Sequence, residues 1–227
     1  QEKKHEIKTT NVLKHAYVST LTKGSKGIIL DEDFEGGTMP TGWTAVDGAN
    51  AWTIATDNSS AYWTIPSHTT YASINDDAGG NGADNSDTYL ITPEISLSGT
   101  TAPKLSFAGL PDAQYGGVHT IKISTDGGST WTDVQTLTAS SSWNTYEIDL
   151  DSYNTESSVY LAFHYNDAGG WMTGFAVDDV MVYDPEPYQF AFTQPGDETV
   201  QSGETFDYMV IVENKGTSND IYDLSIT

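Results

Sequence analysis

One stretch near the end of the chain limits the possible folds more than any other. Gly174-Phe-Ala-Val-Asp-Asp-Val-Met-Val-Tyr183 is typical of a β-strand, because bulky apolar residues recur along it. Two adjacent carboxylates, Asp178 and Asp179, occupy its middle. Adjacent strand residues point to opposite faces, so we expect one of the two to face inward. A buried carboxylate is costly without a partner, so the fold must supply one.

Protein cations that could act as this partner are scarce. The 227 residues include nine Lys and Arg against 32 Asp and Glu, for a formal net charge of −23. Six of the nine Lys lie within residues 1–26. A hard divalent cation such as Ca²⁺, which takes oxygen ligands, fits the need better. We therefore predict that calcium joins this strand to the start of the domain, near Asp33-Phe-Glu35.

The composition excludes several functions. Cys is absent, so the chain has no disulfide, no thiolate zinc site and no Cys nucleophile. The acidic surface repels nucleic acid and anionic lipid, and no apolar run reaches the roughly 18 residues that a membrane span needs. We expect neither nucleic-acid binding nor membrane insertion. The chain begins with Gln rather than Met, which is compatible with a removed signal peptide and with secretion.

Short alternating segments between turn residues predict an all-β protein of three parts. Residues 1–29 form a basic leader or linker, either flexible or docked on the acidic body by charge. Residues 30–184 form a β-sandwich that ends at the stiff Asp184-Pro-Glu-Pro187 segment. Residues 185–227 are long enough for the first part of an immunoglobulin-like β module. The expected sandwich strands lie near residues 84–97, 104–110, 119–137, 143–150, 158–165 and 174–183.

Two acidic segments are candidate metal sites. Asp33 and Glu35 alternate with Phe34, so on a strand they would share one face, and the Gly-Gly that follows allows a close turn around an ion. Asp76 and Asp77 lie in a turn-rich loop at 73–82 that resembles a later Asn-Asp-Ala-Gly-Gly loop containing Asp167. Asp and Gly also suit turns for backbone reasons alone, so both readings of these loops stay open.

Other side chains indicate binding rather than catalysis. The aromatic residues near loops, Trp63, Tyr115 and Trp171, could stack on sugars or anchor a protein, although packing is the alternative. The segment Ser124-x-Asp-x-Gly-x-x-Trp131 occurs once, which favours a structural hairpin over a propeller blade. The five His are scattered, and neither a His-Glu-x-x-His nor a Gly-x-Ser-x-Gly motif is present. We expect no enzyme activity.

Several motifs follow one another in an order that resembles one family. Together they resemble the cleaved-adhesin domain of bacterial haemagglutinins and gingipain-type proteases, and the related MAM-like, choice-of-anchor J domain. The segment after residue 184 resembles the start of a bacterial immunoglobulin-like domain. The motifs are Asp33-Phe-Glu35 with Pro40-x-Gly-Trp43, Asp87-Thr-Tyr-Leu-Ile-Thr-Pro93, Leu105-Ser-Phe107, Ile123 to Trp131, Trp143 to Leu150, Leu161-Ala-Phe-His-Tyr165 and Val177-Asp-Asp-Val180.

The resemblance implies a jelly-roll β-sandwich with structural calcium and no catalytic centre. Carried over by position, it makes Glu35 and one of Asp178 or Asp179 the best metal ligands, ahead of Asp33, Asp76 and Asp77. It implies a secreted or cell-surface module that mediates adhesion, or that targets a neighbouring peptidase to a host or matrix protein or glycan. Neighbouring domains of the same larger protein are expected partners.

A structural role is the alternative function. An incomplete second module with an unpaired strand edge at 205–227 invites strand addition from a neighbour. The chain would then be a subunit of a surface filament or secretion assembly.

Overall fold

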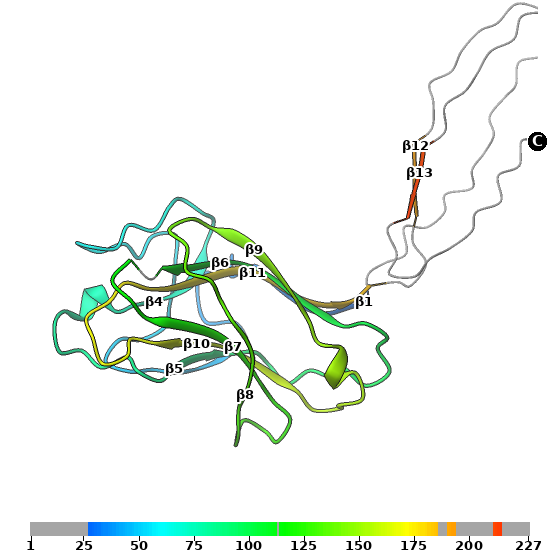
Figure 1. Cartoon of the computed structure of the whole chain (residues 1–227), viewed down its shortest axis with the longest axis horizontal. Helices are drawn as coiled ribbons and strands as arrows, with labels where there is room; N and C mark the ends of the chain where they lie inside the picture. The colour runs from blue at the N-terminus through cyan, green and yellow to red at the C-terminus, as the bar shows by residue number, and fades with distance from the viewer. Residues whose placement is uncertain (1–26, 113, 186–189, 194–210, 215–227) are drawn as a thin grey trace, which may run out of the picture. The chain divides into compact units, whose positions relative to one another are not determined.

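The computed structural model describes residues 27–112 and 114–185, together with two short strands further along the chain (Figure 1). Its contacts separate a unit spanning Lys26–Pro185 from a second unit. In the second unit, β12 (Phe190–Thr193) pairs antiparallel with β13 (Ile211–Asn214). Residues 1–26 of the predicted basic leader lie outside the described residues, whereas residues 27–29, which were assigned to that leader, begin β1. Apart from β12 and β13, the predicted immunoglobulin-like module and its edge at 205–227 also lie outside the described residues.

The unit of residues 26–185 is a sandwich of two antiparallel sheets, which Figure 1 shows as two layers. This confirms the predicted all-β, jelly-roll-like class. One sheet has the order β3 (Thr53–Ala55), β4 (Tyr71–Asn75), β11 (Gly174–Asp184), β6 (Lys104–Asp112), β9 (Asn144–Asp149), with β1 (Gly27–Glu32) also on β11. The other has the order β2 (Thr44–Val46), β5 (Thr88–Ile91), β10 (Tyr160–Asn166), β7 (Val118–Ser124), β8 (Thr132–Thr136).

Helical structure is confined, in the described part, to the short 3₁₀ turns η1 (Asp77–Gly79) and η2 (Asp151–Tyr153). None of the helices described is long and apolar enough to cross a bilayer. The scarcity of helix agrees with the lack of helical periodicity in the sequence.

The core lies between the sheets and is built on aromatic side chains. Alternate residues of β10 face inward, and Phe163 packs edge-on against Phe107 of β6, with 5.0 Å between ring centroids. Trp43 stacks on Phe163 at 6.5 Å, and Trp52 meets Phe175 at 6.1 Å. The two Trp are each 5 % exposed and belong to the core. Such aromatic pairs add to the burial of apolar area that holds the layers together.

Strand β11 is central to its sheet, as expected for the segment that organises the fold. It pairs with β6 along one edge. Along the other edge it pairs with β4 at residues 174–177 and with β1 at residues 180–184. At the change of partner Asp179 has φ 50°, and the register against β6 shifts between Asp178 and Met181, which together form a β-bulge. Asp178 is fully buried and Asp179 is exposed.

Two local predictions are wrong. Asp33, Phe34 and Glu35 do not alternate along a strand, because β1 ends at Glu32 and Phe34 has φ 53°. This turn buries the Phe34 ring against Trp43, with 5.2 Å between centroids. Residues 73–75 are not part of a loop either, since they complete the buried strand β4.

Candidate functional site

The first candidate site lies at the bulge of β11, where β4 and β1 leave a break in the sheet. His68, Thr69 and Thr70 lead into β4, and the Asp33–Glu35 turn follows β1, so both segments arrive at this break. His68, Asp178 and Asp179 each offer a ligand atom, and these atoms lie within 4.8 Å of one another. We call these three residues the bulge site.

Asp178 is the buried centre of the bulge site. Its Oδ2 lies 2.7 Å from His68 Nδ1 and accepts a hydrogen bond from Thr69 Oγ1 at 2.9 Å. Its Oδ1 accepts the backbone N–H of Asp179 at 2.8 Å. Burial raises the pKa of the Asp178 carboxyl, although these hydrogen bonds oppose the rise. A cation that replaced the lost hydration would favour the charged carboxylate here.

Glu35 reaches the same segment from the other side. Its carboxylate accepts the backbone N–H of Thr70 at 2.8 Å and Thr70 Oγ1 at 3.3 Å. Asp178 and Glu35 therefore accept hydrogen bonds from two adjacent residues, Thr69 and Thr70. This arrangement is compatible with the predicted link between the two segments. Asp33 is exposed, and its Oδ1 caps its own turn by accepting the Glu35 N–H at 3.1 Å.

The donor set fits a cation, with one unexpected member. Carboxylate oxygens of Asp178 and Asp179 suit Ca²⁺, which prefers oxygen, whereas the imidazole nitrogen of His68 is more typical of transition-metal sites. Glu35 is not among the residues whose ligand atoms lie within 4.8 Å of one another. Sequence reasoning missed His68, which is 110 residues from Asp178. No motif surrounds it, and only the antiparallel pairing of β4 with β11 brings it to the bulge.

The second acidic region lies where the two similar Asp-rich loops meet. The backbone N–H of Asn85 donates to Asp167 Oδ2 at 2.7 Å, and the side-chain amide of Asn85 donates to Asp76 Oδ1. The Met172 N–H donates to Asp76 Oδ2. Burial raises the pKa of Asp76, and the charges of Asp167 and Asp77 raise it further. We call Asp76, Asp77, Asn85 and Asp167 the loop-end cluster.

The loop-end cluster is separate in its bonding from the bulge site. In the described part of the chain, no hydrogen bond joins Asp76 or Asp77 to Glu35, to Asp178 or to the donors of those two residues. Asp77 Oδ2 instead accepts the hydroxyl of Ser60 and the backbone N–H of Tyr62, the latter at 2.8 Å. The prediction that Asp76 and Asp77 are metal ligands therefore concerns a different place from the bulge.

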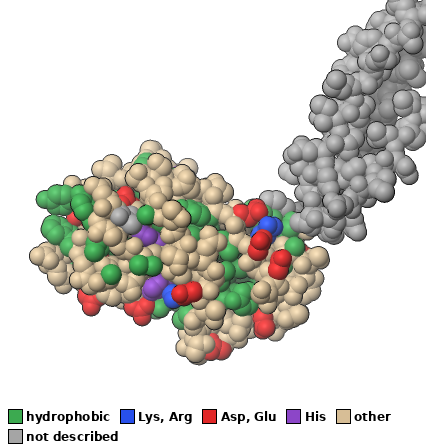
Figure 2. All heavy atoms as spheres, viewed as in Figure 1, with side chains coloured by type: hydrophobic (Ala, Val, Ile, Leu, Met, Phe, Trp, Pro, Cys, Tyr) green, Lys and Arg blue, Asp and Glu red, His purple; other side chains and the backbone are tan. Residues whose placement is uncertain are grey.

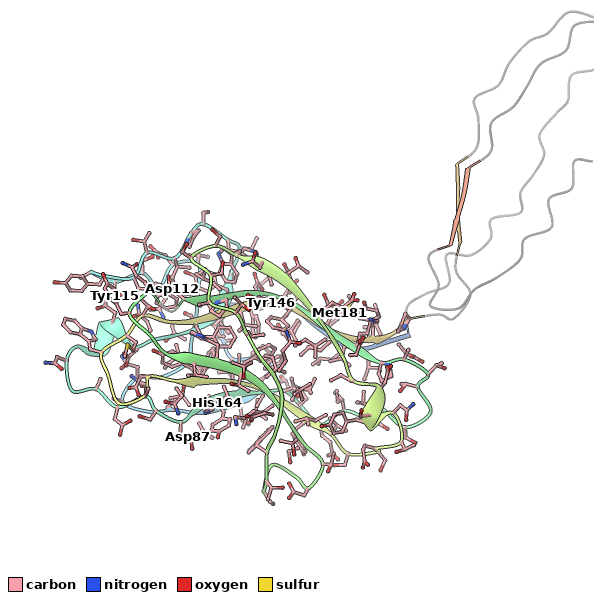
Figure 3. All side chains as sticks on the ribbon, viewed as in Figure 1. Asp87, Asp112, Tyr115, Tyr146, His164 and Met181 are labelled. Atoms are coloured by element: carbon pink, nitrogen blue, oxygen red, sulfur yellow. The ribbon has the colours of Figure 1, made fainter. Side chains whose placement is uncertain are left out.

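An aromatic pocket adjoins the loop-end cluster. Tyr62, Tyr115 and Trp171 are 58 %, 50 % and 42 % exposed, and with Asp77 and Met172 they line a cavity of about 180 Å³. Tyr62 and Trp171 meet edge to face, with ring centroids 5.5 Å apart at 87°. Figure 3 labels Tyr115 at the end of the sandwich near η1, and Figure 2 shows hydrophobic side chains gathered at that end. Two of the three predicted ligand-binding aromatics therefore line one pocket.

Trp63 does not belong to this pocket, and the alternative of packing holds for it. It is 1 % exposed and packs in a small core cluster with Tyr71, Leu110 and Ala176. A Cβ on Gly174 would lie 2.6 Å from the Trp63 ring, so the glycine at the start of β11 makes room for the indole. Gly174 is therefore the sequence feature that could have indicated a buried Trp63.

The remaining described histidines serve packing. His164 Nε2 lies 2.9 Å from Asp87 Oδ1, and burial lowers the His164 pKa. Burial lowers the pKa of His119 to about 4, while its Nε2 contacts the Gly174 carbonyl at 3.0 Å.

The hairpin of β7 and β8 is also structural, because Asp126 accepts hydrogen bonds from Thr130 and Ser124 within the turn.

Comparison with known proteins supports the predicted resemblance. Residues 27–134 match the family model of the Cleaved Adhesin Domain. Over 202 residues the chain is 28 % identical to Lys-gingipain of Porphyromonas gingivalis. This alignment covers 80 % of this chain but only 11 % of the length of Lys-gingipain.

Solved structures agree on the fold. The K3 and K1 cleaved adhesin domains of Lys-gingipain from Porphyromonas gingivalis superpose with TM-scores of 0.52 and 0.51. Each is 23 % identical to this chain and covers 69 % of it, and the match spans 98 % of each domain. The sandwich therefore shares the fold of these cleaved adhesin domains.

Proposed function

We propose that this cleaved-adhesin-type sandwich is a non-catalytic binding module of a larger secreted or cell-surface protein. It attaches that protein, or a peptidase that neighbours it in the chain, to a host or matrix protein or to a glycan. The observation that carries the proposal is the aromatic pocket. Exposed aromatic rings that surround a cavity are a common basis of recognition, because each offers a large apolar face with a polar edge.

The likeness to Lys-gingipain supports the same proposal. The matched region corresponds to domains that are named adhesins in a protein that is itself a gingipain. Because the match covers 11 % of that relative, the partners and the setting of this chain remain our own inference. The high negative charge suits a protein kept soluble among divalent cations outside the cell.

Calcium at the bulge site is the second part of the proposal. Asp178 and Asp179 would hold the ion from β11, and Glu35 would hold it from the turn after β1. His68 either adds a ligand or keeps Asp178 oriented through its Nδ1 contact. The ion would close the break between β4 and β1 and so fix the edge of the sheet. Its role is structural, since the bulge site and the aromatic pocket have no described hydrogen-bond partner in common.

Binding to immobilised ligands tests the proposed function. The full chain is applied to a glycan array and to a panel of matrix proteins, alongside Trp171→Ala and, as the matched control, Trp131→Ala. Trp131 is a half-exposed indole on the β7–β8 hairpin, where it stacks on Tyr89. We expect at least one ligand whose signal falls tenfold or more in Trp171→Ala and stays unchanged in Trp131→Ala. Absence of binding to every array and panel member would remove the basis of the proposal.

A further inference from the structure

We propose that the aromatic pocket recognises a side-chain cation, the guanidinium of Arg or the ammonium of Lys, presented by a partner protein. This inference rests on the proposed function and names the ligand of the same site. It follows from the size of the cavity, the arrangement of its rings and the charge around it.

The size of the cavity favours a single head group. Sites that enclose whole small molecules commonly measure about 300–1,000 Å³. The pocket lined by Tyr62, Tyr115 and Trp171 has a volume of about 180 Å³. It can accept one side-chain end, whereas an oligosaccharide would extend beyond it.

The rings form walls in different directions. Tyr62 and Trp171 stand nearly perpendicular, at 87°, and Tyr115 supplies a third aromatic side. The Trp171 indole N–H donates to the Asp77 carbonyl at 3.2 Å, which orients the ring at the rim. The faces of aromatic rings carry partial negative charge and attract cations, and several rings around one cavity form a cage for a cation.

The charge around the pocket is uncompensated. Residues 27–185 contain 22 Asp and Glu but only two Lys, Lys104 and Lys122. Both Lys are already paired, Lys104 with Glu147 and Asp149, and Lys122 with Asp133. Among the described residues, no Lys or His forms an ion pair with the loop-end carboxylates behind the pocket. An arriving cation would meet an attractive potential that is not cancelled locally.

Asp77 carries this charge into the cavity wall. Its Oδ2 holds the donors from Ser60 and Tyr62, and in the described part of the chain no donor reaches its Oδ1. Asp77 is 6 % exposed, so a charged donor that reached this oxygen would form a shielded, charge-assisted hydrogen bond. A neutral sugar could stack on the rings but would leave this charge unanswered.

Short blocked peptides test the inference directly. The full chain is titrated by NMR with Ac-Gly-Ser-Arg-Ser-Gly-NH₂ and with the citrulline peptide of the same shape but no charge. A Lys peptide and its acetyl-lysine form make a second matched pair. We expect the Trp171 indole signal to shift with the Arg and Lys peptides, and the affinity for citrulline and acetyl-lysine to be at least tenfold weaker. Increasing ionic strength should weaken only the charged peptides.

Variants locate the binding. Trp171→Ala and Tyr115→Ala should each weaken the Arg peptide tenfold or more, and both side chains are exposed, so folding is preserved. Asp77→Asn should weaken the charged peptides toward the level of the neutral ones. Trp131→Ala should leave both unchanged. Thermal melts of each variant confirm that the sandwich is intact before binding is compared.

The outcomes separate this inference from the proposed function. Equal binding of charged and neutral peptides, or binding that survives Trp171→Ala, would overturn the cation site. A Trp171-dependent glycan signal without any peptide binding would also overturn it, while the proposed binding module would stand. Failure of the peptides, glycans and matrix proteins alike would reject both.

Discussion

The bulge site and the loop-end cluster both bury carboxylates, but they satisfy them with different donors. At the bulge, Asp178 Oδ1 accepts the backbone N–H of Asp179, but its Oδ2 meets His68 Nδ1 and the Thr69 hydroxyl, groups that can either donate or accept a hydrogen bond. At the loop end, Asp76 meets the amide NH₂ of Asn85 and the backbone N–H of Met172, which can only donate. The two regions contain the same acidic residue type and still have different chemistry.

The difference separates a site that can exchange partners from one that is fixed. His68 and Thr69 can turn away or change role when an ion binds Asp178. The Asn85 amide cannot reverse, because its Oδ1 accepts the Asn50 N–H at 2.9 Å and its Nδ2 also donates to Asn50. The bulge site is therefore suited to an ion, and the loop-end cluster is suited to holding two loops in place behind the aromatic pocket.

The largest expected effect concerns Trp63 and Trp171, which were both candidates for ligand binding. Trp63→Ala removes a buried indole and should lower the free energy of unfolding by about 3–5 kcal/mol. Trp171→Ala alters an exposed ring and should cost less than about 1 kcal/mol. Chemical denaturation with a common m-value measures both. Similar losses in the two variants would mean that the Trp171 ring is part of the core and does not line an exposed pocket.

Much of the fold was predictable because it depends on local pattern. Apolar alternation located strands β5 to β11, although not β2, β3 or β4, and Asp-Gly-Gly located the hairpin between β7 and β8. The sequence also indicated that one of Asp178 and Asp179 would be buried. It did not show that a bulge separates them, because the bulge arises where β11 exchanges β4 for β1, and that depends on distant pairing.

The candidate sites were less predictable for the same reason. Nothing near His68 marks it, and its contact with Asp178 is made only once β4 lies beside β11. Phe34 was expected on a strand, but burial of its ring beside Trp43 requires a turn. Ligand binding and packing were both open for Trp63, and the missing Cβ of Gly174 lets it pack inside. Each miss reflects packing between segments far apart in sequence.

Calcium should distinguish the two regions by the next largest effect. Binding to the native state alone stabilises by about 2.7 kcal/mol at a hundredfold excess over the dissociation constant. We expect a rise of several degrees in the melting temperature on adding calcium, reversed by chelator. The rise should be absent in Asp178→Asn and reduced in Glu35→Gln, while Asp77→Asn should keep it.

Two results would change this assignment. A calcium response that is lost in Asp77→Asn and kept in Asp178→Asn would move the ion to the loop-end cluster. No response in the wild-type chain at any calcium concentration would mean that the carboxylates at the bulge rely on His68 and the threonines alone.

The smallest expected effect tests whether the hydrogen-bond partners of Asp76 and Asp178 differ as described. It is measured in the presence of a chelator. Asp76→Asn places an NH₂ group against fixed N–H donors, so the free energy of unfolding should fall by about 1–3 kcal/mol. Asp178→Asn can keep its amide oxygen on the Asp179 N–H and place its NH₂ group against His68 and Thr69, which can accept, and it removes a charge whose burial is unfavourable. It should therefore raise the melting temperature at pH 7.

The pH dependence of stability tests the direction of the change predicted for Asp178→Asn. The pKa of Asp178 is raised above its usual 3.8, so the folded state favours the protonated acid. The stability that protonated Asp178 contributes is complete below pH 3.8 and is lost as the pH rises through the folded pKa. The advantage of Asp178→Asn over wild type should therefore be present at pH 7 and vanish as the pH falls toward 3.8. Asp126→Asn is the opposite control: turn hydrogen bonds hold the pKa of Asp126 at about 2, so this variant should be less stable at pH 7. An advantage of Asp178→Asn that persisted at pH 3.8, or never appeared, would show that the two acidic regions do not differ in the way their donors indicate.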